Sequence, residues 1–197
     1  MKIDFKNDVT RAQEEAEGSD GRLNVSGRTD SRGYYNSRDK QQMYSIAWDM
    51  QNASAGEFVM YLKNTSATMD IVITGVGFNA EQNAKCKLSV VTGTAASGNE
   101  ITPVNLNLGS SNAADCISRE GGSAASGITG ITESGLIDLA YVQANGHEEF
   151  RIADRLRLVQ NTAIAIEYDE GTDGDCSGVM FFLSLIHISE PTRQAEI

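Results

Sequence analysis

The chain has 197 residues and a formal net charge of −11 at pH 7. This acidity argues against binding to a nucleic-acid backbone, which requires clustered Lys and Arg side chains. Residues 1–17 lack the apolar core of a signal peptide, and no stretch approaches the roughly twenty apolar residues of a membrane-spanning helix. We therefore expect a soluble, negatively charged protein that binds neither nucleic acid nor membrane.

The N-terminal segment, residues 1–20, is predicted to be an arm. Its residues are mostly polar, and a thin apolar stripe at helical spacing runs through Val9, Ala12 and Ala16. Such a stripe is too narrow to stabilise an isolated helix. We expect either a mobile arm or a short helix between Asp4 and Glu17 that needs a partner. A glycine-rich break then ends the arm.

A long polar connection follows, from Gly27 to Lys40, and it is rich in Arg, Ser, Asp and Tyr. Tyr34, Tyr35 and Arg38 are the candidate interaction residues of the chain, because aromatic and arginine side chains are enriched at interfaces. A strip of this kind suits subunit docking or sugar binding. A solvated loop with one tyrosine packed under the main domain explains the same residues equally well.

Beyond this connection the hydrophobic period is two, which is typical of half-buried strands. Apolar side chains alternate with polar or small ones in five sets: Phe58/Met60/Leu62, Cys86/Leu88/Val90, Val104/Leu106/Leu108, Leu156/Leu158 and Ile164/Ile166/Tyr168. Turn sequences rich in Asn, Gly, Asp and Ser separate these sets. We therefore predict an all-β domain over residues 21–182, an antiparallel β-sandwich or jelly roll, with Trp48 in its core.

Two segments depart from this simple alternation. Residues 109–132 are small, polar and glycine-rich, and only Cys116 and Ile117 suit a strand. We expect a long excursion across the surface, where contacts with partners often lie. The run 75–77, Gly-Val-Gly, lacks the rest of a dinucleotide fingerprint, so close strand packing or a bulge explains it better.

No motif predicts catalysis, and no cofactor is expected. His147 is the one histidine before residue 183, and Arg151 stands where a zinc-protease motif needs its second histidine. No Gly-x-Ser-x-Gly sequence marks a nucleophilic serine. We expect His147 to be a solvated hairpin residue and the protein not to be an enzyme.

The three cysteines are Cys86, Cys116 and Cys176. They are widely spaced and odd in number, a pattern that matches neither a disulfide framework nor a zinc site. We expect free buried thiols, as in a protein that folds in a reducing cytosol.

An oxygen-rich run near the end of the domain holds the metal candidates Asp169, Asp173 and Asp175. Oxygen-rich turns bind calcium. Compared with the helical calcium loop, however, Gly171 stands at a ligand position and Met180 where the closing glutamate belongs. A hairpin tip, whose Asp and Gly residues supply turn geometry, is the favoured interpretation, and no metal is expected.

The last fifteen residues, Leu183 to Ile197, resemble the conceptual translation of a sequencing-library adapter. The resemblance implies that the gene was read from a short fragment of environmental DNA, that these residues are not native, and that the natural C-terminus is missing. We therefore expect residues 183–197 to contribute nothing to the native fold. Their alternating apolar residues nevertheless imitate a strand, and such a segment can fill an open sheet edge.

Six segments carry a family resemblance: GRLNV at 21–25, YLKNTS at 61–66, VTGTAASG at 91–98, ITPVNLN at 101–107, GSSNAA at 109–114 and NTAIAIEY at 161–168. In this order they are similar to segments of a widespread group of tailed-phage virion structural proteins. The resemblance spans nearly the whole chain before residue 183. It implies a β-sandwich subunit of a phage particle, made in the host cytoplasm and located in the virion.

The resemblance implies a non-catalytic structural subunit, either a head-decoration or a tail-associated protein. Its expected partners are copies of itself, by analogy in a trimer, and other virion proteins, with residues 1–20 helping to hold it on the particle. The alternative is a receptor- or glycan-binding module that contacts a host surface through residues 109–132 or through Tyr34 and Tyr35. A depolymerase-like enzyme lacks a paired-carboxylate or triad signature.

Overall fold

The computed structural model describes residues 4–6, 13–15, 40–122, 126–152 and 156–186. The chain divides into two compact units, at residues 1–31 and 32–197, which are taken separately.

The first unit contains a short antiparallel ladder. Strand β1 (Asp4–Lys6) pairs with strand β2 (Gln13–Glu15). The helix expected between Asp4 and Glu17 is therefore wrong for these residues. One valine and two alanines give an isolated helix too little apolar burial, whereas paired strands bond their backbone groups to each other.

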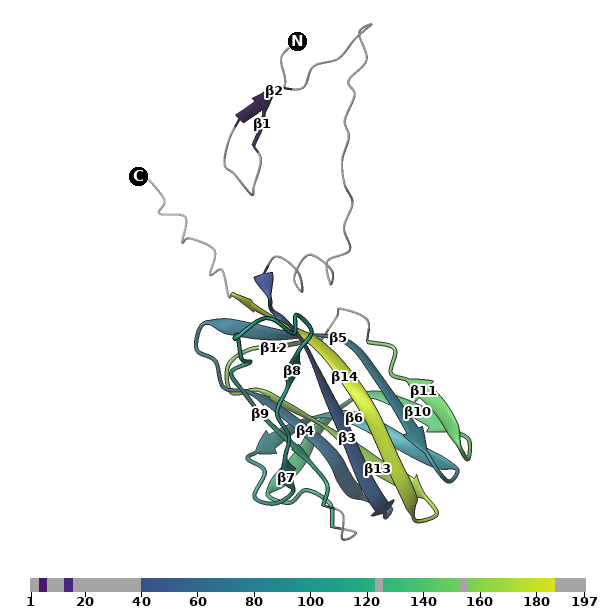
Figure 1. The fold of residues 1–197 in the computed structure, drawn as a ribbon. Coiled ribbons are helices and arrows are strands. Elements are labelled where there is room, and N and C mark those ends of the chain that lie inside the picture. Colours follow the sequence, from purple (N-terminus) through teal and green to yellow (C-terminus); the bar gives the residue numbers. More distant parts are fainter. Residues whose placement is uncertain (1–3, 7–12, 16–39, 123–125, 153–155, 187–197) are drawn as a thin grey trace, which may run out of the picture. The chain divides into compact units, whose positions relative to one another are not determined.

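The second unit is built from antiparallel strands in two layers, which Figure 1 shows. Their bounds are β3 (Met43–Ala53), β4 (Glu57–Asn64), β5 (Met69–Ala80), β6 (Ala84–Gly93), β7 (Asn99–Glu100), β8 (Val104–Asn105), β9 (Cys116–Glu120), β10 (Ile131–Val142), β11 (Gly146–Glu149), β12 (Leu156–Leu158), β13 (Ala163–Gly171) and β14 (Gly174–Ile186). Among the described residues, sheet 1 has the order β10-β6-β13-β4-β9-β7. Sheet 2 has the order β11-β5-β14-β3-β8, and β12 also pairs with β5.

The strand order is that of a jelly roll. The long strands β3, β4, β5 and β6 alternate between the sheets, and after an insertion β10, β11 with β12, β13 and β14 alternate in the same way. Four strands of sheet 2 (β3-β14-β5-β11) and four of sheet 1 (β4-β13-β6-β10) thus form two interlocked Greek keys. The prediction of an all-β antiparallel sandwich is confirmed.

The segment between β6 and β10 extends both sheets at the same side. Strand β9 pairs with β4 at the edge of sheet 1, and β7 pairs with β9. Strand β8 pairs with β3 at the edge of sheet 2. The glycine-rich excursion expected over 109–132 belongs to this insertion, and its expected strand-like point at Cys116 is the first residue of β9.

One apolar core fills the space between the sheets. Most of the predicted alternating sets lie in it, and so does Trp48, which is 2 % exposed. Gly178 lies directly opposite Trp48 on β14, and the indole occupies the space into which a side chain at Gly178 would project. Core residues from the predicted sets are Met60, Leu62, Cys86, Leu88, Leu158, Ile164, Ile166 and Tyr168.

The predicted set Phe58/Met60/Leu62 is broken by a bulge. Met60 pairs with Ile166 and Phe58 with the next residue, Glu167, so Val59 is the extra residue of β4. A bulge of this kind changes which face the following side chain takes. Val59 therefore joins the core between the sheets, and Phe58 packs in a separate cluster on the outer face of sheet 1.

A second predicted set does not reach the core. Strand β8 has only two residues, and Val104, Leu106 and Leu108 are 53 %, 36 % and 86 % exposed. Val90, three residues before the end of β6, is also 38 % exposed. Alternation alone does not show whether a second layer covers the apolar side of a strand. At the edge of this sandwich, the apolar side of the set Val104/Leu106/Leu108 is not covered.

The Gly-Val-Gly run in β5 combines both features expected of it. Phe181 pairs with Gly75 and Phe182 with Ile73, so β5 bulges at Thr74. At Gly77, the imidazole of His147 occupies the place of a β-carbon. A side chain at residue 77 would meet this ring, because the neighbouring strand β11 brings it close to the backbone of β5.

The C-terminal strand continues past the boundary predicted between residues 182 and 183. Strand β14 runs to Ile186, and Leu183 pairs with Met43 on one side and Val72 on the other. Leu183 is 1 % exposed. Residues 183–186 therefore extend the central strand of sheet 2 rather than fill a sheet edge, and the expectation that they are not native stays a prediction. Residues 187–197 lie outside the described residues.

Candidate assembly surface

The outer face of sheet 2 is apolar and free of charge along its centre. Residues opposite one another on paired strands share a face of the sheet. Val104 lies opposite Ser45, Ser45 opposite Phe181, and Ala47 opposite Val179. These side chains are exposed or half-buried. Met43 lies two residues before Ser45 on the same side of β3. Together these residues form the apolar face, which consists of Met43, Ser45, Ala47, Val104, Val179 and Phe181.

The strand at the centre of this face is apolar on both sides. Val179 to Phe182 read Val-Met-Phe-Phe, and Met180 and Phe182 fill the core, so Val179 and Phe181 turn outward. A continuous apolar run is typical of a strand that is covered on both faces, whereas a strand with one solvated face alternates. The pattern of β14 thus favours a covered outer face. The search for alternating apolar residues did not identify Val179 and Phe181. The uninterrupted apolar run in the sequence was the signal that could have identified them.

The insertion adds exposed leucines beside this face. The Leu106 N–H donates a 2.9 Å hydrogen bond to the Met43 carbonyl, which holds residue 106 against the edge of β3. The Asn105 side chain donates to the Gln41 carbonyl at 2.9 Å and accepts from the Asn107 N–H at 2.9 Å. This anchored turn leaves Leu108 86 % exposed. The apolar surface therefore continues along the edge of sheet 2.

The outer face of sheet 1 has the opposite character. Lys85 and Asp169 form an ion pair at 2.7 Å, and Lys87 bonds the same carboxylate. Lys87 also lies 3.8 Å from Glu167. Nearby, the Ser89 hydroxyl donates a 3.0 Å hydrogen bond to the carboxylate of Glu133 on β10. Charges on this face are thus matched within the chain itself.

The pKa values of this cluster show how close its charges lie. Burial raises the pKa of Glu167 above its usual value, despite the neighbouring Lys87. At Asp169, burial acts in the same direction, but hydrogen bonds from Lys85 and Lys87 outweigh it and lower the pKa. The hydrogen bond with Asp169 raises the pKa of Lys87. The opposite shifts of Glu167 and Asp169 follow from their contacts, because both lysines bond Asp169 whereas Glu167 lies 3.8 Å from Lys87 alone.

The insertion covers a second part of the outer face of sheet 1. Ile128 and Ala95 pack onto Tyr61 and Ala165 in a second, smaller apolar cluster. The Ile128 N–H donates a 2.9 Å hydrogen bond to the Phe58 carbonyl. The excursion expected from the glycine-rich sequence thus covers part of the outer face of sheet 1. The side chains of the apolar face of sheet 2, by contrast, are exposed or half-buried.

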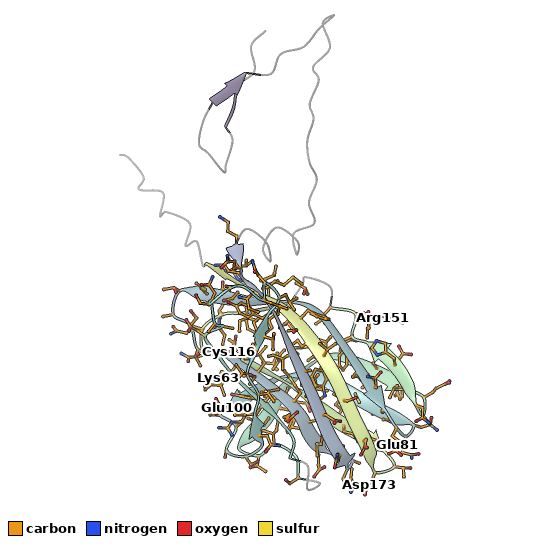
Figure 2. The ribbon with its side chains drawn as sticks, in the orientation of Figure 1. Lys63, Glu81, Glu100, Cys116, Arg151 and Asp173 are labelled. Atoms are coloured by element: carbon orange, nitrogen blue, oxygen red, sulfur yellow. The ribbon has the colours of Figure 1, made fainter. Side chains whose placement is uncertain are left out.

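The calcium candidates are separated. Asp169 is bonded to the lysines of sheet 1, while the Asp175 carboxylate accepts a 2.9 Å hydrogen bond from the Asn52 N–H. Asp173 lies at the exposed hairpin tip, at the same end of the sandwich as Glu81 (Figure 2). Within the described part of the chain, no group of three or more His, Cys, Asp or Glu side chains is placed to hold a metal ion.

The other candidates from the sequence are scattered. Tyr34, Tyr35 and Arg38 lie outside the described residues. His147 is 53 % exposed at its side chain, and its Nδ1 is 2.9 Å from the amide oxygen of Asn79. The cysteines are free, with Cys86 and Cys176 buried and Cys116 half-buried. None of these residues belongs to the apolar face.

No family model, curated protein or solved structure matches the chain. In the described residues, no helix is long and apolar enough to cross a membrane.

Proposed function

We propose that this protein is a non-enzymatic structural subunit of a tailed bacteriophage particle that assembles with copies of itself and with other particle proteins. The apolar face of sheet 2 is the observation that carries the proposal. Jelly rolls build viral capsid proteins as well as lectins, so the fold permits this function without requiring it. The six sequence segments between residues 21 and 168 that resemble phage virion proteins, in the same order along the chain, support a role in a phage particle.

Charge favours association through the apolar face. Each copy carries a net charge of −11, so two copies repel one another where charged surfaces meet. The apolar face holds no charged side chain, and burial of its apolar surface stabilises a complex by about 25 cal/mol per Å². Copies related by symmetry can bury the same strip in a closed assembly. A subunit that cements or decorates a particle would be held in this way.

The place in the particle follows from the family resemblance. We propose a head-decoration or tail-associated position in the virion, reached after synthesis in the host cytoplasm. A trimer is proposed by analogy with phage proteins alone. Residues 1–20 are proposed to help hold the subunit on the particle, where repeated weak contacts around a symmetry axis raise the overall affinity.

A surface hollow favours a second candidate function, the binding of a host-surface glycan. Tyr141 is 66 % exposed and lines a hollow of about 440 Å³ together with Asn83 and Lys85. An aromatic ring beside amide and charged groups can stack on a sugar ring and bond its hydroxyls. Glycan-array binding that Tyr141→Ala removes without lowering the melting temperature would place this function ahead.

Sedimentation velocity of the full chain over a range of concentrations tests the assembly function. We expect an oligomer in the wild type, and Phe181→Asp should weaken it by roughly 30-fold or more, because a carboxylate would be buried in an apolar contact. Thr132→Asp adds the same charge on an exposed position of sheet 1 and should leave association unchanged.

Folding of each variant is checked by circular dichroism. Should Phe181→Asp not fold, Ala47→Glu places a charge on the same face at an exposed position. A wild type that stays monomeric at roughly 100 μM, a concentration that populates even weak specific complexes, contradicts the proposed self-assembly.

A further inference from the structure

A hollow on sheet 1 contains a lysine and no acidic residue. It lies beside Lys63, near the end of β4 (Figure 2), and has a volume of about 460 Å³. The end of β6 with Thr94 and the turn that precedes β13 form the rest of its wall. None of the lining residues that the structure describes bears a carboxylate. In a chain of net charge −11, this local excess of positive charge stands apart from the rest of the surface.

The ammonium group of Lys63 is available to a ligand. Lys63, Ala163 and Val91 lie opposite one another on three paired strands, so they share the outer face of sheet 1. The ammonium donates a 3.2 Å hydrogen bond to the hydroxyl of Thr94. Within the described part of the chain it has no carboxylate partner, whereas the two lysines near Asp169 share that carboxylate. An ammonium has three N–H groups, so two of them remain for another acceptor.

The neighbouring polar groups add further donors. Because Thr94 accepts the bond from Lys63, the hydrogen of its own hydroxyl is left for a second acceptor. The exposed side chain of Asn161 adds an amide NH₂ group to the wall. The Thr162 hydroxyl already donates to the Val159 carbonyl at 2.7 Å. The hollow thus offers an ammonium, a hydroxyl and an amide as donors, a set that suits a negatively charged oxygen ligand.

Backbone hydrogen bonds fix the wall of the hollow before any ligand binds. The Asn161 N–H donates to the Asn64 carbonyl at 2.8 Å, and the Asn64 N–H donates to the Thr162 carbonyl at 3.1 Å. At the end of β6, Gly93 has a φ of +93°, and a β-carbon there would lie 2.4 Å from the Gly130 carbonyl oxygen. A wall held in this way loses little conformational freedom on binding.

We propose that this hollow binds the carboxylate group of a small organic ligand, with an acidic sugar as the fitting class. The single positive charge of Lys63 matches the single charge of a carboxylate, whereas a phosphate dianion would keep an uncompensated charge. Val90, which is 38 % exposed, and the methyl groups of the threonines give the carbon skeleton of the ligand an apolar contact. The site lies on the opposite sheet from the apolar face and does not depend on self-association.

A nuclear magnetic resonance titration of the full chain with glucuronate tests the proposal. We expect the backbone amide signals of Thr92, Thr94, Asn161 and Thr162 to shift together, with a Kd of roughly 1–10 mM for so small a ligand. Glucose has the same ring without the carboxylate and should shift these signals little at the same concentration. Inorganic phosphate should bind more weakly than glucuronate.

Two substitutions connect the binding to the donors. Lys63→Gln should weaken glucuronate binding by roughly 10-fold or more, because it removes the charge-assisted hydrogen bond. Lys63→Arg should retain most of the affinity. Lys87→Gln is the matched control, since it makes the same change elsewhere on the same face and should leave the Kd unaltered. Should Lys63→Gln not fold, Thr94→Val removes one donor at an exposed position and should weaken binding as well.

Four results would overturn the assignment. The first is an absence of shifts at about 50 mM glucuronate, well above the expected Kd. The second is an equal response to glucose, which would leave the carboxylate without a role. The third is tighter binding of phosphate than of glucuronate. The fourth is an equal loss of affinity in Lys63→Gln and Lys87→Gln, which would indicate attraction by overall charge rather than by this hollow.

Discussion

The two sheets meet solvent in different ways. Sheet 1 turns ion pairs such as Lys85–Asp169 outward and covers part of its outer face with its own insertion, while Tyr141 opposite Lys85 stays exposed. Sheet 2 turns Phe181, Val179 and Ala47 outward. Because one core already fills the space between the sheets, a second apolar face is more than folding requires. The proposed assembly rests on this difference between the two sheets.

The two faces also differ in how their sequences predict them. In sheet 1, Ile164, Ile166 and Tyr168 face the core as their alternation predicts, and Glu167 lies on the other side near Lys87, whereas Ala165 on that side is covered by the insertion. In sheet 2, Val179 to Phe182 are apolar throughout. Such a run predicts that both sides of the strand are buried. It does not indicate what buries the outer side, and in the single chain Val179 and Phe181 are only half-buried.

The largest expected effect concerns the end of β14. Truncation after Phe182 removes Leu183, which is 1 % exposed, and its backbone pairing with two strands. We expect a loss of stability of at least about 2–5 kcal/mol, the cost of truncating a buried leucine. Truncation after Ile186 should change the melting temperature little. Equal melting temperatures for the two truncated chains would show that residues 183–186 do not support sheet 2.

A second effect separates two cations that the sequence treats alike. Both Lys87 and Arg157 occupy the polar side of an alternating set, and this pattern alone predicts that substitution of either costs little. Arg157, however, bonds Asp70, which is only 5 % exposed. Chemical denaturation should show that Arg157→Ala costs about 1–3 kcal/mol, because a buried carboxylate loses a charged partner. Lys87→Ala should cost under about 1 kcal/mol, as for exposed ion pairs.

A third effect concerns the salt dependence of association. Contact through the apolar face brings two acidic copies together without ion pairs across the interface, so salt should screen their repulsion and tighten the complex. Contact through the charged face of sheet 1 would respond in the opposite sense. Sedimentation at about 50 mM and about 500 mM salt distinguishes them. Weaker association at high salt would exclude the apolar face as the main contact.

The smallest effect is the pH dependence of the charged face. The pKa of Asp169 is lowered in the folded state, so its ionised form stabilises the fold at neutral pH. This contribution declines as pH falls below the unfolded value of about 3.9 and is lost below the lowered folded pKa. Asp169→Asn should cost under about 1 kcal/mol at pH 7, and thermal melts should show the difference closing in strong acid.

Glu167 supplies the internal comparison for that measurement. Burial raises its pKa, so its charge at neutral pH works against the fold, and the penalty is relieved as the carboxyl protonates in acid. Glu167→Gln should therefore keep or gain stability at pH 7, where Asp169→Asn loses it. A parallel response of the two variants would contradict the assignment of opposite pKa shifts.

Much of the fold could be predicted from local pattern. Met60, Leu62, Leu88 and Ile166 lie in the core because a strand with one covered face must place alternate side chains there. The exceptions depend on neighbours. Val59 turns inward because β4 bulges against β13, and a bulge depends on the pairing of two strands rather than on either sequence alone.

The candidate surface was much less predictable. The exposed set Val104, Leu106 and Leu108 carries the same alternation as the core strands, and only its place at the edge of sheet 2 explains its exposure. Phe181 and Val179 join Ala47 in one face because β14 pairs with β3 from the other end of the chain. Short-range periodicity contains no information about such distant partners.

The sequence by itself determined that the chain is acidic, that its strands alternate, and that an all-β sandwich would form, because these properties depend on composition and on neighbouring residues. Only the tertiary structure decided which apolar sets are buried, and that one outer face carries an ion-pair network while the other presents Phe181, Val179 and Ala47. Each of these depends on which distant strands lie together, and strand order is set by the packing of the whole sandwich.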